Sequence, residues 1–250
     1  MTAIVLGHVP IAITILPFVP IPSEESWSYI AVGILLHFVY QLLLLSSYRI
    51  GDLTQVYPIA RGTAPLIVAG VSTGLLGVEL KLFEIIAILV IGIGILSLSI
   101  TRQKDGLRNV KAGIYAFLTG CFIAGYSLVD GIGARLAGTA LSFYCWLTIG
   151  NAVVFAIFML ITKPGVLKTL PSQGKQVFLI GGSASFIAYA IVIWAFTQAP
   201  IALVTALRET SIVFALMIGV FFLKEKLDLA KLFSTMVTLL GAAILRLGKT

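Results

Sequence analysis

The sequence predicts an all-α polytopic membrane protein, an inverted repeat of five-helix units in which the first helix is missing, leaving nine transmembrane helices. Three observations predict this fold. The chain of 250 residues is 59% hydrophobic and 11% charged, with a mean hydropathy of +1.09, whereas about a quarter of a soluble domain is charged. Its apolar residues form long unbroken runs, which excludes a membrane β-barrel. Two of these runs carry the same Arg-x-Thr triplet.

Nine stretches supply the ~20 mostly apolar residues that a membrane-spanning helix needs. They are residues 3–20, 27–48, 54–78, 82–101, 111–129, 139–162, 176–197, 200–223 and 228–246. No Lys or Arg precedes the first stretch, so we expect a retained span and no signal peptide. The longest connections, 101–111 and 162–175, are too short to form a domain, so the function must reside among the helices.

The repeat emerges when the chain is shifted against itself by 147 residues. This offset aligns Arg61 with Arg208, Thr63 with Thr210 and Gly94 with Gly241. The two triplets lie on the third and eighth spans, so the copies must have opposite orientations, as in many secondary transporters. We expect a first repeat over residues 1–104 with four spans and a second over 105–250 with five.

Loop charges predict the orientation. Apart from Arg61 and Arg208, eleven cations fall on one side of the membrane and four on the other, so the first side is predicted to be cytoplasmic. The N-terminus then faces the cytoplasm and the C-terminus faces outward. The eleven are Arg49, Arg102, Lys104, Arg108, Lys111, Lys163, Lys168, Lys175, Lys224, Lys226 and Lys231; the four are Lys81, Arg135, Arg246 and Lys249.

Arg61 and Arg208 are the main candidates for solute binding. Each lies about eight residues, ~12 Å, into its span, and the two enter from opposite sides. Charges at such depth normally face the bundle interior or a water-filled cavity. A guanidinium group there could bind a carboxylate or phosphate bidentately, or it could instead pair with a protein acid and fix helix contacts.

Two acids are candidates for coupling or gating. Glu209 follows Arg208 directly, and adjacent residues on a helix point to different partners. Glu209 is either a proton carrier, since a carboxyl group inside the bilayer can exchange protons near neutral pH, or an interhelical salt-bridge acid. Asp130 lies near the outer end of the fifth span, where pairing with Arg135 is the simpler expectation.

Two prolines flank Arg61 on the third span and are the other gating candidates. Pro58 and Pro65 each remove a backbone hydrogen bond, and carbonyl groups exposed at such breaks often line transporter sites. A packing kink without a ligand is the alternative.

Aromatic and hydroxyl side chains complete the predicted wall. The predicted substrate-binding set is Arg61, Arg208, Tyr57, Thr63, Thr210, Tyr126 and Tyr189. Further wall candidates are His37, Tyr40, Trp146, Asn151 and Trp194; for His37 a helix-to-helix hydrogen bond is the simpler expectation, and for Trp194 an interfacial belt.

Several classes of function are not expected. Cys121 and Cys145 lie in apolar runs and indicate neither disulfides nor a metal site, so no metal and no cofactor is predicted. The cations form no basic stripe, so nucleic acid is not an expected partner. Motifs of zinc hydrolases, serine hydrolases, P-loop proteins and dinucleotide-binding enzymes are absent from the sequence, so we expect no enzyme.

Two segments resemble the ends of the two repeats in EamA-type proteins of the drug/metabolite transporter superfamily. They are residues 51–66 (GDLTQVYPIARGTAPL) and residues 199–227, the second of which ends in FLKEKL. The resemblance implies two inverted five-helix repeats, a central cavity and movement of small organic solutes, often outward. It also implies two cytoplasmic termini, against the loop-charge prediction for the C-terminus. Since we count only four spans in the first repeat, we expect the family's first helix to be missing here, through a late start, through truncation of the sequence or because this variant lacks it.

We therefore expect a secondary transporter of amino-acid-like or anionic metabolites in a cell membrane, the bacterial inner membrane fitting best. Its expected partners are the solute, the lipid bilayer and, as one option, a second copy in a homodimer. Two alternatives stay open: a flippase for a lipid-linked sugar or phospholipid, and a membrane subunit that does not transport.

Overall fold

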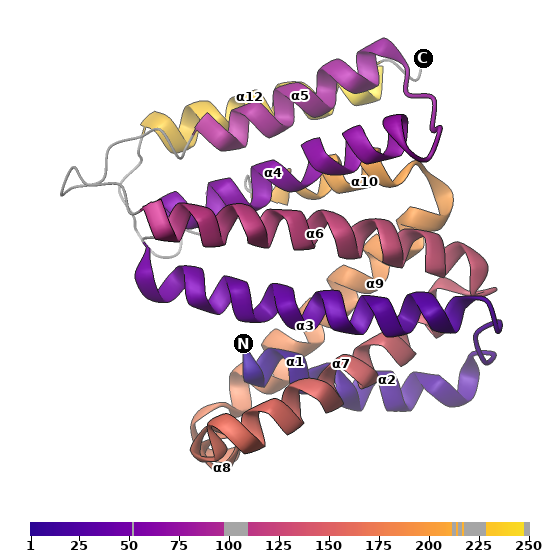
Figure 1. Ribbon diagram of the computed structural model, residues 1–250, viewed down its shortest axis with the longest axis vertical. Coiled ribbons are helices and arrows are strands. Elements are labelled where there is room, and N and C mark those ends of the chain that lie inside the picture. The colour runs from indigo at the N-terminus through magenta and orange to yellow at the C-terminus, as the bar shows by residue number, and fades with distance from the viewer. Residues whose placement is uncertain (52, 98–109, 212–213, 215–216, 218–228, 248–250) are drawn as a thin grey trace. The chain divides into compact units, whose positions relative to one another are not determined.

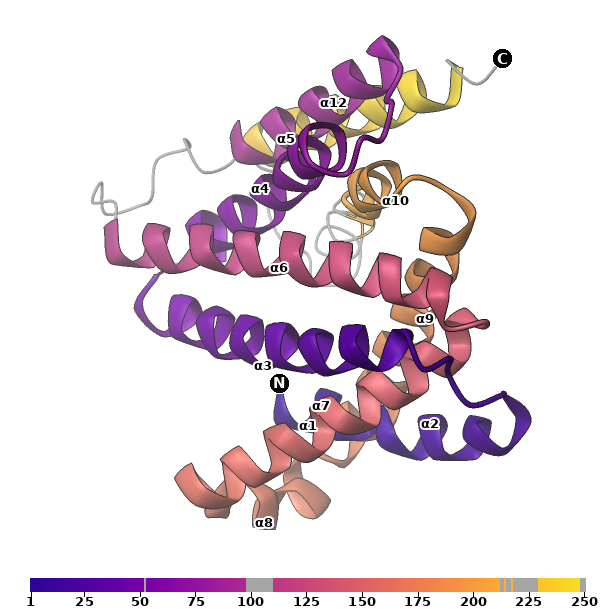
Figure 2. The ribbon, with the colours of Figure 1, turned by 45° about the vertical axis from the view of Figure 1, so that its right-hand side comes forward.

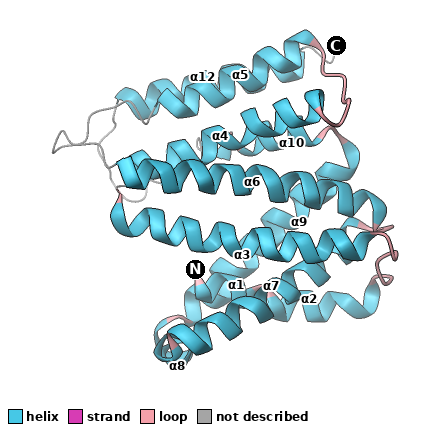
Figure 3. Ribbon diagram, in the orientation of Figure 1, coloured by secondary structure: helices cyan, strands magenta, loops and turns pink. Residues whose placement is uncertain are grey.

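Every regular element that the structure describes is a helix. The structure is a computed structural model, and it describes residues 1–51, 53–97, 110–211, 214, 217 and 229–247 (Figures 1 and 3). Four helices in these ranges are long and apolar enough to cross a membrane: Ser26–Ile50, Val110–Leu136, Ala140–Thr162 and Val177–Gln198. Shorter apolar helices cover Thr2–Phe18, Leu82–Ser97 and Leu232–Ile244. The protein is therefore a multi-pass helical membrane protein.

Contacts between residues divide the chain into two compact units. The first, unit 1, contains Met1–Gln41 and Leu128–Ala199, and the second, unit 2, contains Leu42–Ser127 and Pro200–Thr250. Helices α3 (Ser26–Ile50) and α6 (Val110–Leu136) contribute residues to both. Each unit thus takes segments from both predicted repeats, and the division at residue 104 stays a prediction.

Unit 1 begins with a predicted span that is broken into three pieces. These are α1 (Thr2–Gly7), α2 (Val9–Ile15) and the 3₁₀-helix η1 (Leu16–Phe18). Proline explains the breaks, because Pro10 and Pro17 lie in the first turns of α2 and η1 and have no N–H to donate to the preceding turn. The rest of unit 1 comprises α7 (Ala140–Thr162), α8 (Pro164–Gln173), the π-helix η3 (Val177–Gly181) and α9 (Gly182–Gln198).

Glycine allows the first helix to approach closely the segment around η3. A Cβ atom on Gly7 would fall against the carbonyl oxygen of Phe178, and one on Gly182 would lie 2.7 Å from the Cα atom of Gly7. The loop over residues 162–175, which we expected only as a connection, forms α8 with Pro164 at its first turn. Proline is favoured there because the first N–H groups of a helix have no partner within it.

Unit 2 contains α4 (Leu53–Gly74), α5 (Leu82–Ser97), α10 (Ile201–Arg208) and α12 (Leu229–Leu247). Helices α5 and α12 run side by side (Figure 2), and α4 packs on both α5 and α10. Pro58 and Pro65 are buried inside α4, which continues as one helix through both. The second half of the predicted span 200–223 and the FLKEKL segment lie outside the described residues.

Candidate functional site

Arg61 and Glu209 form an ion pair inside unit 2. Nε of Arg61 on α4 lies 3.1 Å from Oε2 of Glu209, the residue that follows α10. The Glu209 side chain is 3% exposed and that of Arg61 is 22% exposed. The guanidinium group also donates a 3.2 Å hydrogen bond to Oγ of Ser211 and lies 5.8 Å from the centre of the Tyr57 ring. A paired and half-buried cation is thus held in one orientation by three side chains.

Arg208 faces a different helix from its neighbour. Its guanidinium group is 3.5 Å from Oγ of Ser127 on α6, within unit 2. Both arginine charges act on the Glu209 carboxylate. Arg208 and Glu209 therefore have different partners, as we expected for adjacent residues on a helix. Arg61, Arg208 and Glu209, here called the arginine cluster, thus bring two guanidinium groups and one carboxyl group together within unit 2.

The two threonines predicted to bind solute lie in the same unit, but their hydroxyl groups bond to nearby backbone carbonyls. Thr63 donates to the carbonyl oxygen of Ile59 at 2.6 Å, and Thr210 donates to that of Leu207 at 2.7 Å. Tyr126 on α6 is 4% exposed. Each threonine oxygen keeps an acceptor position, whereas its proton is already committed to the backbone.

Asp130 belongs to a second cluster, inside unit 1. Its Oδ2 atom is 2.8 Å from Nε2 of His37 on α3 and accepts a 2.8 Å hydrogen bond from the Tyr189 hydroxyl on α9. The His37 contact confirms the expected helix-to-helix hydrogen bond. Sequence reasoning assigned Tyr189 to solute binding and Asp130 to coupling or gating, and missed that Tyr189 and His37 both bond to the same oxygen atom of Asp130.

The expected pairing of Asp130 with Arg135 is wrong. Arg135 instead donates to the carbonyl oxygens of Phe196 and Ala199, at 2.9 Å each, where α9 ends. Residues five apart lie on different faces of a helix, since only the third and fourth neighbours share a face. The last carbonyl groups of a helix have no partner within it, and a guanidinium group satisfies them well.

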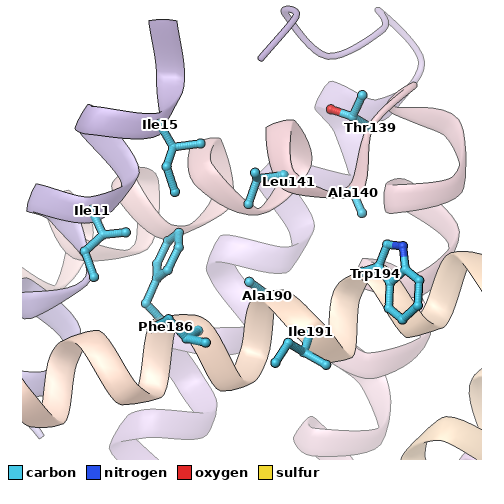
Figure 4. Close-up of a pocket in the computed structure, with 10 residues that line it drawn as sticks. Ile11, Ile15, Thr139, Ala140, Leu141, Phe186, Ala190, Ile191 and Trp194 are labelled. Carbon is cyan, nitrogen blue, oxygen red and sulfur yellow. The ribbon is translucent and has the colours of Figure 1, made fainter. Parts of the chain in front are cut away.

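A cavity of about 500 Å³ lies in unit 1, between α2, the start of α7 and α9 (Figure 4). None of the residues predicted to bind solute or to gate lines it; of the wall candidates, Trp194 does. Its lining is apolar except for the hydroxyl group of Thr139: Ile11, Ile15, Thr139, Ala140, Leu141, Phe186, Ile187, Ala190, Ile191 and Trp194.

Comparison with known proteins decides the family. The model of the EamA-like transporter family matches residues 111–247, more than half of the chain. The chain belongs to the EamA-like transporter family. It is accordingly a membrane transporter of the drug/metabolite transporter superfamily, in a family that is generally not enzymatic.

The fold has a counterpart among solved structures. A structure titled "Crystal structure of protein" has a TM-score of 0.77 to this EamA-family chain at 18% sequence identity, over 98% of this chain and 85% of its own. At that identity the likeness shows the fold alone. No curated protein matches the chain.

Each of the two clusters lies partly inside and partly outside the residues that the family model matches. Arg208, Glu209, Asp130 and Tyr189 lie within the matched residues, whereas Arg61 and His37 precede them. Each cluster therefore joins residues of the matched EamA segment to a residue outside it. Among the described residues, no group of three or more His, Cys, Asp or Glu side chains is placed to hold a metal ion.

Proposed function

We propose that this EamA-family chain is a secondary transporter that moves small amino-acid-like or anionic metabolites outward across a cell membrane, the bacterial inner membrane fitting best. The arginine cluster is the observation that carries the proposal. Two guanidinium groups and one carboxyl group gathered in one unit of a membrane protein can form charge-assisted hydrogen bonds with a zwitterionic or anionic solute. A solute carboxylate would bind beside Arg61 and Arg208, and a solute amino group could face Glu209.

The remaining residues of the predicted set take part in substrate binding in this proposal. Tyr57 supplies a ring beside Arg61, and Thr63, Thr210 and Tyr126 supply hydroxyl groups within unit 2. Tyr189 belongs to unit 1, where its hydroxyl group donates to Asp130. Pro65 has no N–H to donate to the carbonyl of Arg61, four residues earlier, so the backbone bonding of α4 is altered at the candidate site. We assign Pro58 and Pro65 to gating, and Glu209 and Asp130 to gating or coupling.

We further propose that residues 1–104 and 105–250 are inverted repeats around a central cavity. Packing between α5 and α12 supports this arrangement. A Cβ atom on Gly94 would contact Val237 and the backbone of Thr238, and one on Gly241 would contact Ile91 and the carbonyl of Ala87. Subtracting the offset of 147 turns Gly241 into Gly94 and Thr238 into Ile91, so the two contacts are equivalent under the exchange of repeats that a twofold axis requires.

The test is metabolite profiling of cells and medium, with the wild-type protein and with the double variant Arg61→Gln/Arg208→Gln at equal membrane abundance. We expect amino-acid-like or anionic metabolites to accumulate in the medium only with the wild type. Identical profiles for wild type, variant and cells without the protein would overturn the proposal.

A lipid flippase is the second candidate, because the apolar cavity beside α2 and α9 has a lining suited to an acyl chain. Vesicles containing the purified protein and a fluorescent phospholipid separate the two functions. Exchange of that phospholipid between leaflets, without metabolite export, would favour the flippase.

A further inference from the structure

Three titratable side chains from three helices meet inside unit 1. They are Asp130, His37 and Tyr189, here called the triad. The nitrogen atom of His37 and the hydroxyl group of Tyr189 approach the same carboxylate oxygen, Oδ2, at 2.8 Å each. Asp130 is 0% exposed and His37 is 8% exposed. Since an ionised carboxylate can only accept, Nε2 of His37 must carry the hydrogen atom of its bond.

The second carboxylate oxygen has a different environment. Among the described residues, no hydrogen-bond partner reaches Oδ1 of Asp130, although the atom is buried. It faces the backbone of α3, because a Cβ atom on Gly33 would lie 2.8 Å from it. A buried acceptor without a partner is costly, more so when it is charged. Oδ1 is therefore the atom that can take a proton while both bonds to Oδ2 remain.

Charge balance also favours an added proton. With neutral His37 and ionised Asp130 the triad carries a buried charge of −1. In unit 1, the described elements packed around the triad carry five further titratable side chains, and one arginine whose guanidinium group binds the carbonyls at the end of α9: His8, Tyr29, Tyr40, Tyr144, Cys145 and Arg135. One additional proton makes the triad neutral, whether it resides on Oδ1 or completes an imidazolium–carboxylate pair.

We propose that the triad is a proton-binding site whose loading and release couple solute transport to the proton gradient; this inference rests on the proposed transport function. In loading, a hydronium ion transfers its proton to Oδ1 of Asp130, an O–H bond forms and a water molecule leaves. In release, water takes the proton back and the carboxylate is restored. The bonds from His37 and Tyr189 hold the carboxyl group in place in both states.

The experiment is infrared difference spectroscopy of the purified full chain in lipid vesicles as the pH is raised. The pH difference spectrum of the wild type should contain a C=O component from the protonated Asp130 carboxyl group, and this band should be missing from Asp130→Asn, in which the other acids of the chain still contribute. Glu209→Gln, which removes the other buried acid of the described residues, is the matched control and should retain this band. Absence of the band from the wild type, or its persistence in Asp130→Asn, would overturn the proposal.

A second pair of variants serves if Asp130→Asn does not fold. Tyr189→Phe removes a donor to the carboxylate and should move the midpoint of the band upward by about one pH unit. Tyr115→Phe is its control, because Tyr115 is 37% exposed and lies about four turns before Asp130 on α6. Equal midpoints in the two variants would overturn the assignment.

The infrared readout needs no solute, so it separates this inference from the proposed function. A protein that shows the Asp130 band but exports no metabolite overturns the transport function and the coupling with it, while the proton site stands. A protein that exports metabolites equally with and without a proton gradient keeps the transport function and overturns the coupling.

Discussion

Glu209 holds Arg61 by an ion pair of 3.1 Å between α4 and the end of α10. The offset of 147 residues pairs Arg61 with Arg208, yet the residue after Arg61 is Gly62, so only one copy of the Arg-x-Thr triplet carries an acid. The described contacts of the two arginines therefore differ. Arg61 pairs with the Glu209 carboxylate, whereas Arg208 contacts the Ser127 hydroxyl group and acts on Glu209 through its charge.

We expect Glu209→Gln to lower the free energy of unfolding by about 3 kcal/mol, because it leaves the Arg61 charge among buried groups without its acid. The double variant Arg61→Gln/Glu209→Gln should recover part of this loss. Thermal unfolding of the detergent-solubilised protein measures both, in a double-mutant cycle. Glu84→Gln is the control, since Glu84 accepts from the backbone N–H of Lys81 at the start of α5, and its loss should cost below about 1 kcal/mol. If the losses of stability in Arg61→Gln and Glu209→Gln add up to the loss in the double variant, the two side chains do not interact.

Arg208→Lys should reduce metabolite export about tenfold at equal membrane abundance, because an ammonium group keeps the charge but loses the planar fork that binds a carboxylate bidentately. Insertion should survive, since the charge is unchanged. Arg135→Lys is the matched control: it loses the two bonds to the end of α9 and should lower stability while export per molecule stays unchanged. Normal export by Arg208→Lys would assign the residue to structure.

Gly120→Ala should destabilise the protein by about 2 kcal/mol. The added methyl group would lie 2.9 Å from the carbonyl oxygen of Ala60 and from Cβ of Thr63, and backbone cannot move aside cheaply. Gly70→Ala on α4 meets nothing within 4 Å and should stabilise by about 0.5–1 kcal/mol through its helix propensity. Melting temperatures of the two variants provide the comparison. Equal shifts would show that α4 and α6 do not pack closely at Gly120.

A reporter active only in the cytoplasm should be silent when it is fused after Thr250, because the loop charges place the C-terminus outside. The same reporter inserted after Gln173, at the end of α8, should be active and provides the control. A strong signal after Thr250 would show that the usual family orientation prevails over the loop charges.

The helical, multi-pass fold could be predicted from hydropathy, because lipid demands apolar runs with satisfied backbones. The acidic partner of Arg61 could be narrowed to a few candidates from the sequence, because few acids lie within the predicted spans. The triad could not be predicted. His37, Asp130 and Tyr189 are separated by 93 and 59 positions along the chain, and only the packing of α3, α6 and α9 brings them to one oxygen atom. The backbone bonds of Thr63 and Thr210 have a local cause, since a threonine in or next to a helix readily bonds the carbonyl of the preceding turn. The role of these two residues in solute binding stays a prediction.

The glycine-mediated packing of α5 against α12 has a consequence for biosynthesis. Helix α12 begins at Leu229, long after α5 ends at Ser97, so α5 leaves the ribosome well before its partner. Until then the surface around Gly94 faces lipid, and its carbonyl group lacks the 2.7 Å hydrogen bond from Ser234. Helix α5 therefore stays in the bilayer without its packing partner until α12 is made. A nascent chain that stops before α12 exposes the unpacked face of α5 to membrane chaperones and proteases.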